Sequence, residues 1–292
     1  MNQSEREGDA VTSFKYSYDQ LVYYGEDVDK SIDRLARLGY DAIELAGEPD
    51  AFDAKAVRRG VEQAGIVVGS ICSIYTGDRD LAHPDPEIRK IGVDYVKSVA
   101  DFAAEVGCPT MIVAPSVVGK LKPLASDADE REWAVEGIRE GGEYAASVGV
   151  NLTLECWNRY ETYFLNRLEQ AVDLWHETGL ENGGVMGDTF HMNIEEDSIA
   201  EAIRRTGPLL NHIHLADSNR AAPGQGHTDF APILEALREI DYQGYLTFEL
   251  LPPSADPFAV MQAGGHLDFF DRYTEQAIKR IKGLEGSQQG VS

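Results

Sequence analysis

The chain has 292 residues, of which 43% are hydrophobic and 9% aromatic, so it can bury the core of one large α/β barrel or of two modest domains. Its 50 acidic residues outnumber 26 basic ones, and the net charge of -24 argues against a nucleic-acid-binding or membrane-surface protein, because phosphate and anionic lipid would be repelled. No stretch approaches the roughly 18 apolar residues of a membrane span, and the polar start lacks the pattern of a signal peptide, so we expect a cytoplasmic protein.

The cysteine and lysine usage bears on the surroundings of the protein. Cys72, Cys108 and Cys156 are too few and too scattered for a disulfide framework or a cysteine zinc site, so we expect free thiols. Only nine of the basic residues are lysine. A lysine-poor, carboxylate-rich surface suits a high-salt cytoplasm, and an ordinary acidic protein is an equal alternative.

Short β-type runs alternate with amphipathic helical stretches from one end of the chain to the other. The first expected strand, residues 14–18, is followed by a helical stripe that includes Val28, Ile32 and Leu35. Asp85 before Pro86 predicts the start of a later helix. Further strands are expected at residues 42–46, 66–72, 110–114, 151–155, 184–188, 210–215 and 245–250.

Eight such strand-helix units predict an α/β fold of one domain, a single (β/α)8 TIM barrel, over residues 13–283. We expect residues 1–12 to form a poorly ordered extension and residues 284–292 to form a polar tail. The rival fold, a doubly wound open sheet, would need a glycine-rich phosphate turn after an early strand, and the chain has no G-x-G-x-x-G motif.

The late strands end in polar side chains that face the inside of the expected barrel. In NLTLE, Thr153 and Glu155 share the face opposite to Leu152 and Leu154, because side chains alternate along a strand. The same alternation in YLTFE turns Glu249 inward. Four consecutive strands thus finish with a candidate metal ligand, in the order Glu155, Asp188, His214 and Glu249.

Three carboxylates and one imidazole suit a hard divalent cation such as Mn²⁺, Mg²⁺ or Co²⁺ better than a thiolate-type zinc site. The alternative is a buried polar network without an ion. That alternative would bring several negative charges together without compensation, which destabilises a fold, so we favour a bound cation.

Six segments together resemble a known enzyme family: "LECWNRYET", "GDTFHMNIEE", "HIHLADSNR" with "PGQGHTDF", "YLTFELL" and "DLAHPDPEIRK". In this order and at these spacings the chain is similar to the ketose 3-epimerase branch, the D-tagatose and D-psicose 3-epimerases, of the xylose isomerase-like sugar isomerase/epimerase barrels. The resemblance implies that the four ligands hold a metal, with Mn²⁺ the first choice and Co²⁺ or Mg²⁺ the alternatives. It also implies that His191, Arg220 and Glu161 contact the sugar.

The implied activity is epimerisation of an unphosphorylated ketose at C3 through a metal-stabilised enediolate. Glu155 and Glu249 would be the two catalytic bases, one removing the C3 proton and the other returning a proton from the opposite side.

The site residues also have structural alternatives: Arg220 could pair with Asp217 at the surface, and His191 could merely begin a helix. Glu44 faces the lumen, where we expect it to support the ligands.

Several other functions remain open on the same barrel. They include a hydroxypyruvate-type isomerase, an inosose dehydratase and a C-deglycosidase subunit that acts on 3-oxo-glycosides. From other classes, an abasic-site endonuclease would need more histidines and a basic face, and a non-catalytic sugar-binding protein would not need both Glu155 and Glu249.

The expected partner is a small sugar, with a homo-oligomer, dimer or tetramer, implied by relatives of this size. The early part of the chain resembles the ketose epimerases least, and there Tyr16, Tyr18, Tyr23 and Tyr24, together with Trp157, could form aromatic walls for a ring-shaped or aryl-bearing substrate.

Overall fold

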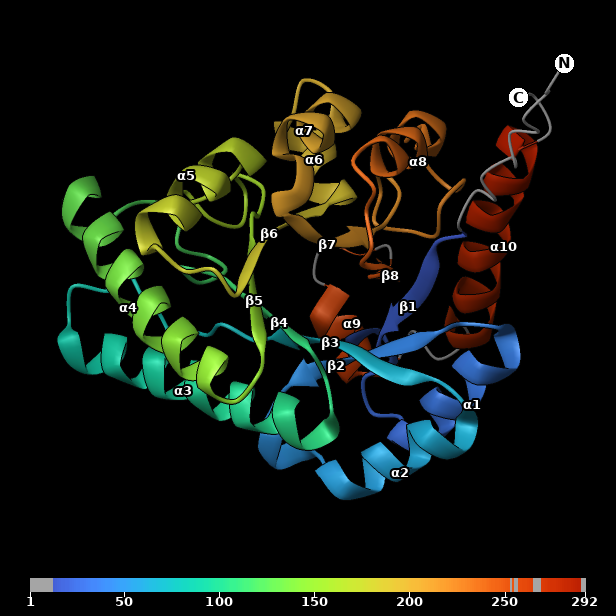
Figure 1. The fold of residues 1–292 in the computed structure, drawn as a ribbon, viewed down its shortest axis with the longest axis horizontal. Coiled ribbons are helices and arrows are strands. Elements are labelled where there is room, and N and C mark those ends of the chain that lie inside the picture. Colours follow the sequence, from blue (N-terminus) through green and yellow to red (C-terminus); the bar gives the residue numbers. More distant parts are fainter. Residues whose placement is uncertain (1–12, 253, 255–256, 265–268, 290–292) are drawn as a thin grey trace, which may run out of the picture.

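The computed structural model describes residues 13–252, 254, 257–264 and 269–289. Within this part of the chain, eight parallel strands close into a barrel in sequence order, each paired with the next and β8 with β1 (Figure 1). The strands are β1 Lys15–Asp19, β2 Ala42–Gly47, β3 Val67–Ser73, β4 Thr110–Val113, β5 Asn151–Glu155, β6 Gly183–Asp188, β7 Leu210–Leu215 and β8 Tyr245–Phe248.

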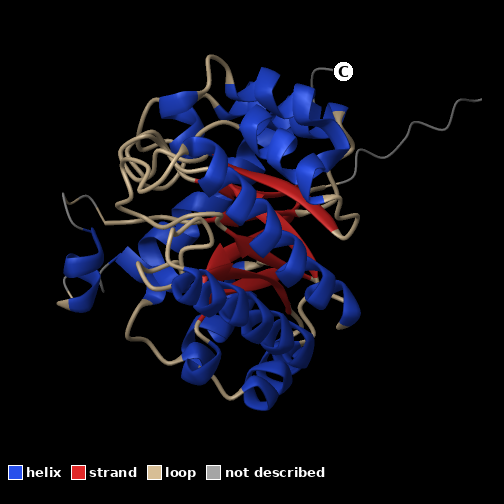
Figure 2. Ribbon diagram, turned by 90° about the vertical axis from the view of Figure 1, so that its left-hand side faces the viewer, coloured by secondary structure: helices blue, strands red, loops and turns tan. Residues whose placement is uncertain are grey.

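Helices surround the strands, as a view from the side makes plain (Figure 2). They are α1 Val28–Leu38, α2 Ala54–Ala64, α3 Pro86–Val106, α4 Asp127–Ser147, α5 Leu168–Thr178, α6 Thr189–Glu195, α7 Ile199–Thr206, α8 Phe230–Glu239, α9 Pro257–Gln262 and α10 Phe269–Gln289. Three 3-10 turns complete the described elements: η1 Gln20–Tyr23, η2 Pro49–Ala51 and η3 Gly207–Leu209. No helix among the described residues is long and apolar enough to cross a membrane.

The single TIM barrel and its expected strands are confirmed, with ends that differ by one or two residues. Asp85 begins α3 as expected and accepts the backbone N–H of Glu87. Gly107 ends that helix in the left-handed conformation with a φ of 79°. The expected extension, residues 1–12, lies outside the described residues.

The polar C-terminal tail expected from residue 284 is wrong as far as Gln289, because α10 continues to that residue. The reason is a tertiary contact. Glu285 is 5% exposed and accepts hydrogen bonds from the Tyr16 hydroxyl and, at 3.2 Å, from the backbone N–H of Phe14. This contact holds the helix against the entry to β1.

Three of the tyrosines proposed as substrate walls belong to the core instead. Tyr16, Tyr18 and Tyr23 are at most 1% exposed. Tyr18 stacks on Tyr23 at 5.0 Å between ring centroids and meets Phe248 at 6.4 Å. The β1 side chains thus fill the space between the barrel and its helices, and the walls of the site come from other residues.

Candidate functional site

The four predicted metal ligands meet at the carboxyl ends of strands five to eight. Glu155 and Asp188 are the last residues of β5 and β6, His214 on β7 is the register partner of Asp188, and Glu249 directly follows β8. None is more than 6% exposed. Ligand atoms of Asp188, His214 and Glu249 all lie within 4.8 Å of one another, and those of Glu155, Asp188 and His191 do so as well.

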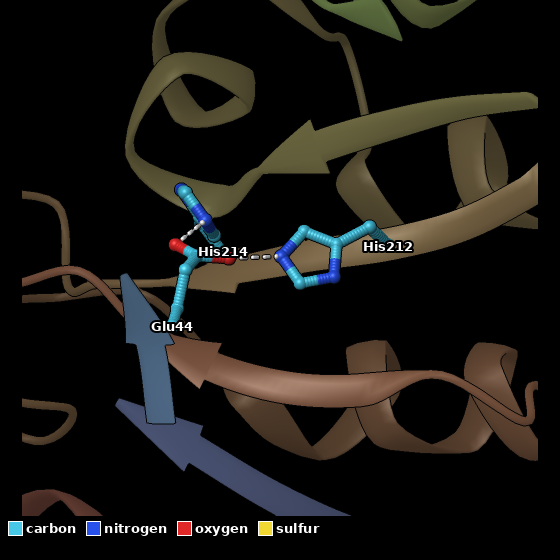
Figure 3. Close-up of side chains that lie close together, drawn as sticks. All are labelled: Glu44, His212 and His214. Carbon is cyan, nitrogen blue, oxygen red and sulfur yellow. Dashed lines mark hydrogen bonds and ion pairs between the residues drawn. The ribbon is translucent and has the colours of Figure 1, made fainter. Parts of the chain in front are cut away.

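Glu44 on β2 reaches across the lumen and lies between the imidazoles of His212 and His214 (Figure 3). His214 Nε2 lies 2.8 Å from Glu44 Oε1, and His212 Nε2 lies 2.8 Å from Glu44 Oε2. Ser70 also donates to this carboxylate. In the neutral imidazole, Nε2 of His214 donates to the carboxylate, so Nδ1 is the nitrogen that would offer its lone pair to a cation in the site.

The donor set fits a divalent cation. Asp188 Oδ2 and His214 Nδ1 are buried and have no hydrogen-bond partner among the described residues, whereas most buried polar atoms in native proteins have one. Both atoms belong to one ligand group with Glu249, and carboxylate oxygens with a neutral imidazole are suitable ligands for Mn²⁺, Mg²⁺ or Co²⁺. The expectation that Glu44 supports a ligand agrees with this geometry.

Burial dominates the acid-base chemistry of the site. It raises the pKa of Glu155 to about 8 and that of Asp188 to about 7, with neighbouring carboxylates adding to the effect. Burial also acts on Glu249, but the charges of Arg220 and His214 outweigh it and hold the pKa of Glu249 well below its usual value. A bound cation would favour the ionised form of every carboxylate that it touches.

His191 lies on α6 with its ring fixed by Asn158. The backbone N–H of Asn158 donates to His191 Nδ1 at 3.2 Å, so this nitrogen is an acceptor and Nε2 carries the proton. Nε2 has no hydrogen-bond partner and lies 3.5 Å from Asp188 Oδ2. Burial and the charge of Arg220 lower the pKa of His191 well below its usual value, so the residue is a neutral donor directed at the metal ligands.

Arg220 points inward, not toward Asp217, which was the partner in its structural alternative and is itself buried. Its Nη2 lies 2.8 Å from Glu249 Oε2 and 3.8 Å from Asp188 Oδ2, and its guanidinium lies over the Phe190 ring at 4.8 Å. Asp217 accepts backbone N–H groups of its own loop instead. The φ of 62° at Arg220 is unusual for a residue other than glycine and directs the side chain into the site.

Glu161 joins the same group from the loop after β5. Its Oε1 accepts the Asn158 side-chain N–H at 3.0 Å and lies 3.4 Å from Arg220 Nη1. The structure thus brings all seven predicted site residues to one end of the barrel. Asn158, which contacts both His191 and Glu161, was missed, because an asparagine just after a strand carries no signal of its own.

A cavity of about 1010 Å³ opens above these residues. Glu155, Glu249, Arg220 and Glu161 line its inner part. Cys72 also lines the cavity, and of the five aromatic residues proposed as walls only Tyr24 and Trp157 do so. Much of the remaining lining comes from the loops after β1, β2 and β3, including Phe52, Ile74 and Tyr75, and from Val28 at the start of α1.

Comparisons with known proteins identify the family. Residues 32–270 match the model of the xylose isomerase-like TIM barrel family. The chain belongs to this family. Within it, the chain is 34% identical over 75% of its length to D-psicose 3-epimerase of Ruminiclostridium cellulolyticum, covering 76% of that protein. It is 30% identical over 81% of its length to 3-dehydro-D-guloside 4-epimerase of Escherichia coli (strain K12), covering 92% of that protein.

Solved structures of family members agree with these matches. D-psicose 3-epimerase with D-tagatose, from Clostridium cellulolyticum H10, has a TM-score of 0.83 at 27% identity, covering 92% of this chain and 99% of the other. The E. coli 3-keto-D-glucoside 4-epimerase has a TM-score of 0.77 at 27% identity, covering 88% of this chain and 99% of the other. The resemblance to the ketose 3-epimerase branch is therefore confirmed, and the protein is an enzyme of the sugar isomerase/epimerase type.

Proposed function

We propose that the protein is a divalent-metal-dependent epimerase of an unphosphorylated keto sugar, in its simplest form a ketose inverted at C3. The observation that supports this most directly is the pair Glu155 and Glu249, two buried carboxylates beside a group of ligand atoms that fits a cation. Relatives named D-psicose, L-ribulose and ketose 3-epimerases point to the same reaction.

Glu155 and Glu249 divide the proton transfer between them. They extend from β5 and from the end of β8, with two strands between them in the closed barrel, so they approach a bound sugar from different sides. One carboxylate removes the proton next to the carbonyl, and the other returns a proton to the opposite face, which inverts the carbon. A cation held by Glu155, Asp188, His214 and Glu249 would supply electrostatic stabilisation for the negative charge that develops on the sugar oxygens.

The remaining residues position the sugar. His191 donates from Nε2, Arg220 offers a buried guanidinium, and Glu161 accepts hydroxyl hydrogens at the inner part of the cavity. Among the cavity-lining residues that the structure describes, Arg220 is the single basic one, and its charge is shared with Glu249 and Glu161. A phosphorylated sugar would need more positive charge than this, so the substrate is unphosphorylated.

A second candidate is 4-epimerisation of a 3-keto-glycoside, which needs the same proton transfer next to a different carbonyl. The match to the E. coli 3-dehydro-D-guloside 4-epimerase, over 92% of that protein, favours it. The two candidates differ in which carbon exchanges its hydrogen, so one labelling experiment separates them.

The test is deuterium uptake in D₂O with Mn²⁺, followed by NMR, for D-psicose, D-tagatose, D-fructose and a set of 3-oxo-glycosides. We expect label at the carbon next to the carbonyl together with a new epimer, and loss of both on addition of a chelator. An eliminated aglycone would assign the enzyme to the lyases instead. Exchange that survives chelation would contradict the metal requirement, and no exchange with any compound would reject the proposed function.

A further inference from the structure

The cavity extends well beyond the residues that would hold a single sugar. Its volume of about 1010 Å³ is at the upper end of the roughly 300–1,000 Å³ found for pockets that bind drug-sized ligands. A free hexose is much smaller than such ligands and would occupy only the inner part. We call the remainder, lined by Tyr24, Val28, Phe52, Ile74 and Tyr75, the outer chamber.

The charged residues that border the outer chamber already have partners. Glu26 forms an ion pair with Arg34 at 2.5 Å, and Glu48 forms one with Arg79 at 2.7 Å. Asp27 accepts a backbone N–H at the start of α1. These groups are therefore engaged in holding the loops, and the surfaces left for a ligand are the aromatic and aliphatic side chains.

A separate observation points to a ligand at the inner edge of the chamber. Tyr75 is 5% exposed and packs edge-on against Tyr95 with 5.6 Å between ring centroids, and its buried hydroxyl has no hydrogen-bond partner within the described part of the chain. The neighbouring Ser73 hydroxyl is also buried and has no partner there. Both residues line the cavity, although the two hydroxyls themselves are shielded from solvent. Buried hydroxyls of native proteins are normally satisfied, so a polar atom of a ligand, met after a small shift of these side chains, is the expected partner.

We propose that the substrate is a keto sugar carrying an aromatic aglycone, with the sugar between Glu155 and Glu249 and the aglycone in the outer chamber. This inference rests on the proposed epimerase chemistry and adds the substrate class to it. Phe52, whose ring is braced by stacking on Phe102 at 5.7 Å, provides the flat surface for the aglycone. Tyr75 donates to a substrate oxygen at the junction of sugar and aglycone.

The experiment compares three kinds of substrate in the Mn²⁺-loaded enzyme. Free ketoses, methyl 3-oxo-glucosides and phenyl 3-oxo-glucosides of both anomeric forms are followed by deuterium uptake, and kcat/KM is measured for each. We expect the phenyl compound of one anomer to exceed its methyl counterpart by about tenfold or more through a lower KM, because its ring leaves water for an apolar chamber.

Two variants change the outer chamber itself: one removes a side chain from its wall, and the other adds a large side chain at its edge. Phe52→Ala removes the stacking surface, and Ala51→Trp places a large ring at an exposed position on the chamber's edge. Each should reduce the ratio of phenyl to methyl kcat/KM by about tenfold, the reverse of the gain expected from burying the ring. Ile91→Ala, on an exposed face of α3 away from the cavity lining, is the matched control and should leave the ratio unchanged.

The possible failures can be told apart. Equal kcat/KM for phenyl and methyl glucosides, or turnover of free ketoses alone, would overturn the aglycone chamber and leave the epimerase chemistry standing. A phenyl preference that both chamber variants leave intact would also overturn it. Absence of exchange with every compound would reject the proposed function from which the inference starts.

Discussion

Glu155 and Glu249 have opposite electrostatic surroundings although both are buried at the same end of the barrel. Burial raises the pKa of Glu155 to about 8, whereas Arg220 and His214 outweigh burial at Glu249 and keep its pKa low. These shifts belong to the metal-free site, and a cation bound there would favour the ionised form of both carboxylates. Because their surroundings differ, the two residues are not interchangeable, and each should be required.

We expect Glu155→Gln and Glu249→Gln each to reduce deuterium exchange by about 10²–10⁴-fold, the usual loss when a general acid or base is removed. Each amide keeps the shape of the side chain, so circular dichroism and the melting temperature should show a folded protein. Glu62→Gln is the control, because that side chain is 64% exposed on α2 and should leave the exchange rate unaltered. Full activity in either active-site variant would remove that glutamate from the mechanism.

The same pKa shifts predict how the stability of the chelator-treated protein depends on pH. Folding raises the pKa of Glu155 from 4.5 to about 8, so the folded state holds this proton more tightly, and the stability gained below pH 4.5 is lost as pH rises toward 8. His214 acts in the same direction, because Glu44 and Glu249 outweigh burial and raise its pKa well above 6.5. The pKa of Glu44 is lowered to about 2, so Glu44 affects the stability of the fold only at acid pH, where its stabilising contribution is lost as the pH falls.

We therefore expect the melting temperature in a chelator to fall between pH 7 and pH 8.5, by an amount on the order of a few degrees for a chain of this size. Mn²⁺ should reduce the fall, because a cation can replace the protons that the site loses. Thermal unfolding followed by circular dichroism at the two pH values, with and without Mn²⁺, measures the effect. A melting temperature that rises over this range in the chelator would contradict the prediction.

Strand alternation predicted the ligands because a side chain that faces the lumen at the carboxyl end of a strand lies at the mouth of the barrel. That argument located Glu155, Asp188 and Glu249 from the sequence. It could not locate Asn158 or Tyr75, because their contacts are made by loops that fold back over the strand ends. The separate suggestion that Tyr16 forms a wall of the pocket was wrong, since an aromatic residue on β1 can pack behind the barrel as well as in its mouth.

At the scale of elements, a buried charged group centred on Lys120 joins the loops after β3 and β4 to the first turn of α4. Lys120 Nζ lies 2.7 Å from Asp80 Oδ2 and 2.6 Å from Glu130 Oε2, and all three side chains are at most 6% exposed. The loop that carries Lys120 also pairs with the loop of Glu161, since Gly119 N–H donates to the Glu161 carbonyl at 2.7 Å. This group therefore supports the loop that presents Glu161 to the site.

We expect Lys120→Met to destabilise the fold by about 3–5 kcal/mol, because it leaves two buried carboxylates without their cation. Lys90→Met is the control: its ion pair with Asp94 is exposed, and such pairs contribute little to stability. Urea unfolding of both variants gives the comparison. A loss for Lys120→Met no greater than for the control would show that the buried group does not stabilise the loops.

The elements themselves followed closely from the sequence. Period-two apolar runs marked the strands, and capping aspartates and left-handed glycines marked helix ends, because these signals act over a few residues. The exception is the end of α10, where the polar sequence suggested a tail. Its helical state depends on Glu285 meeting Tyr16 and Phe14 from the other end of the chain, a contact that no local pattern contains.

At the scale of the whole molecule, the net charge of -24 acts on every part of the fold. Excess charge of one sign repels itself and destabilises the compact state. Salt screens this repulsion, since the Debye length falls from about 10 Å at 0.1 M to about 3 Å at 1 M ionic strength. Salt also weakens the exposed ion pairs, but acidic residues exceed basic ones 50 to 26, so the repulsion is the larger effect.

We therefore expect the melting temperature to rise when KCl is increased from 0.1 M to 1 M, on the order of 5 °C for a chain of this size. Sucrose at matched osmolality is the control, because it stabilises proteins by exclusion without screening charge. A rise in KCl well beyond that in sucrose would favour adaptation of this surface to high salt over an ordinary acidic composition. A melting temperature that falls in KCl would mean that the exposed ion pairs, such as Arg204 with Glu239 and Arg131 with Glu177, outweigh the repulsion.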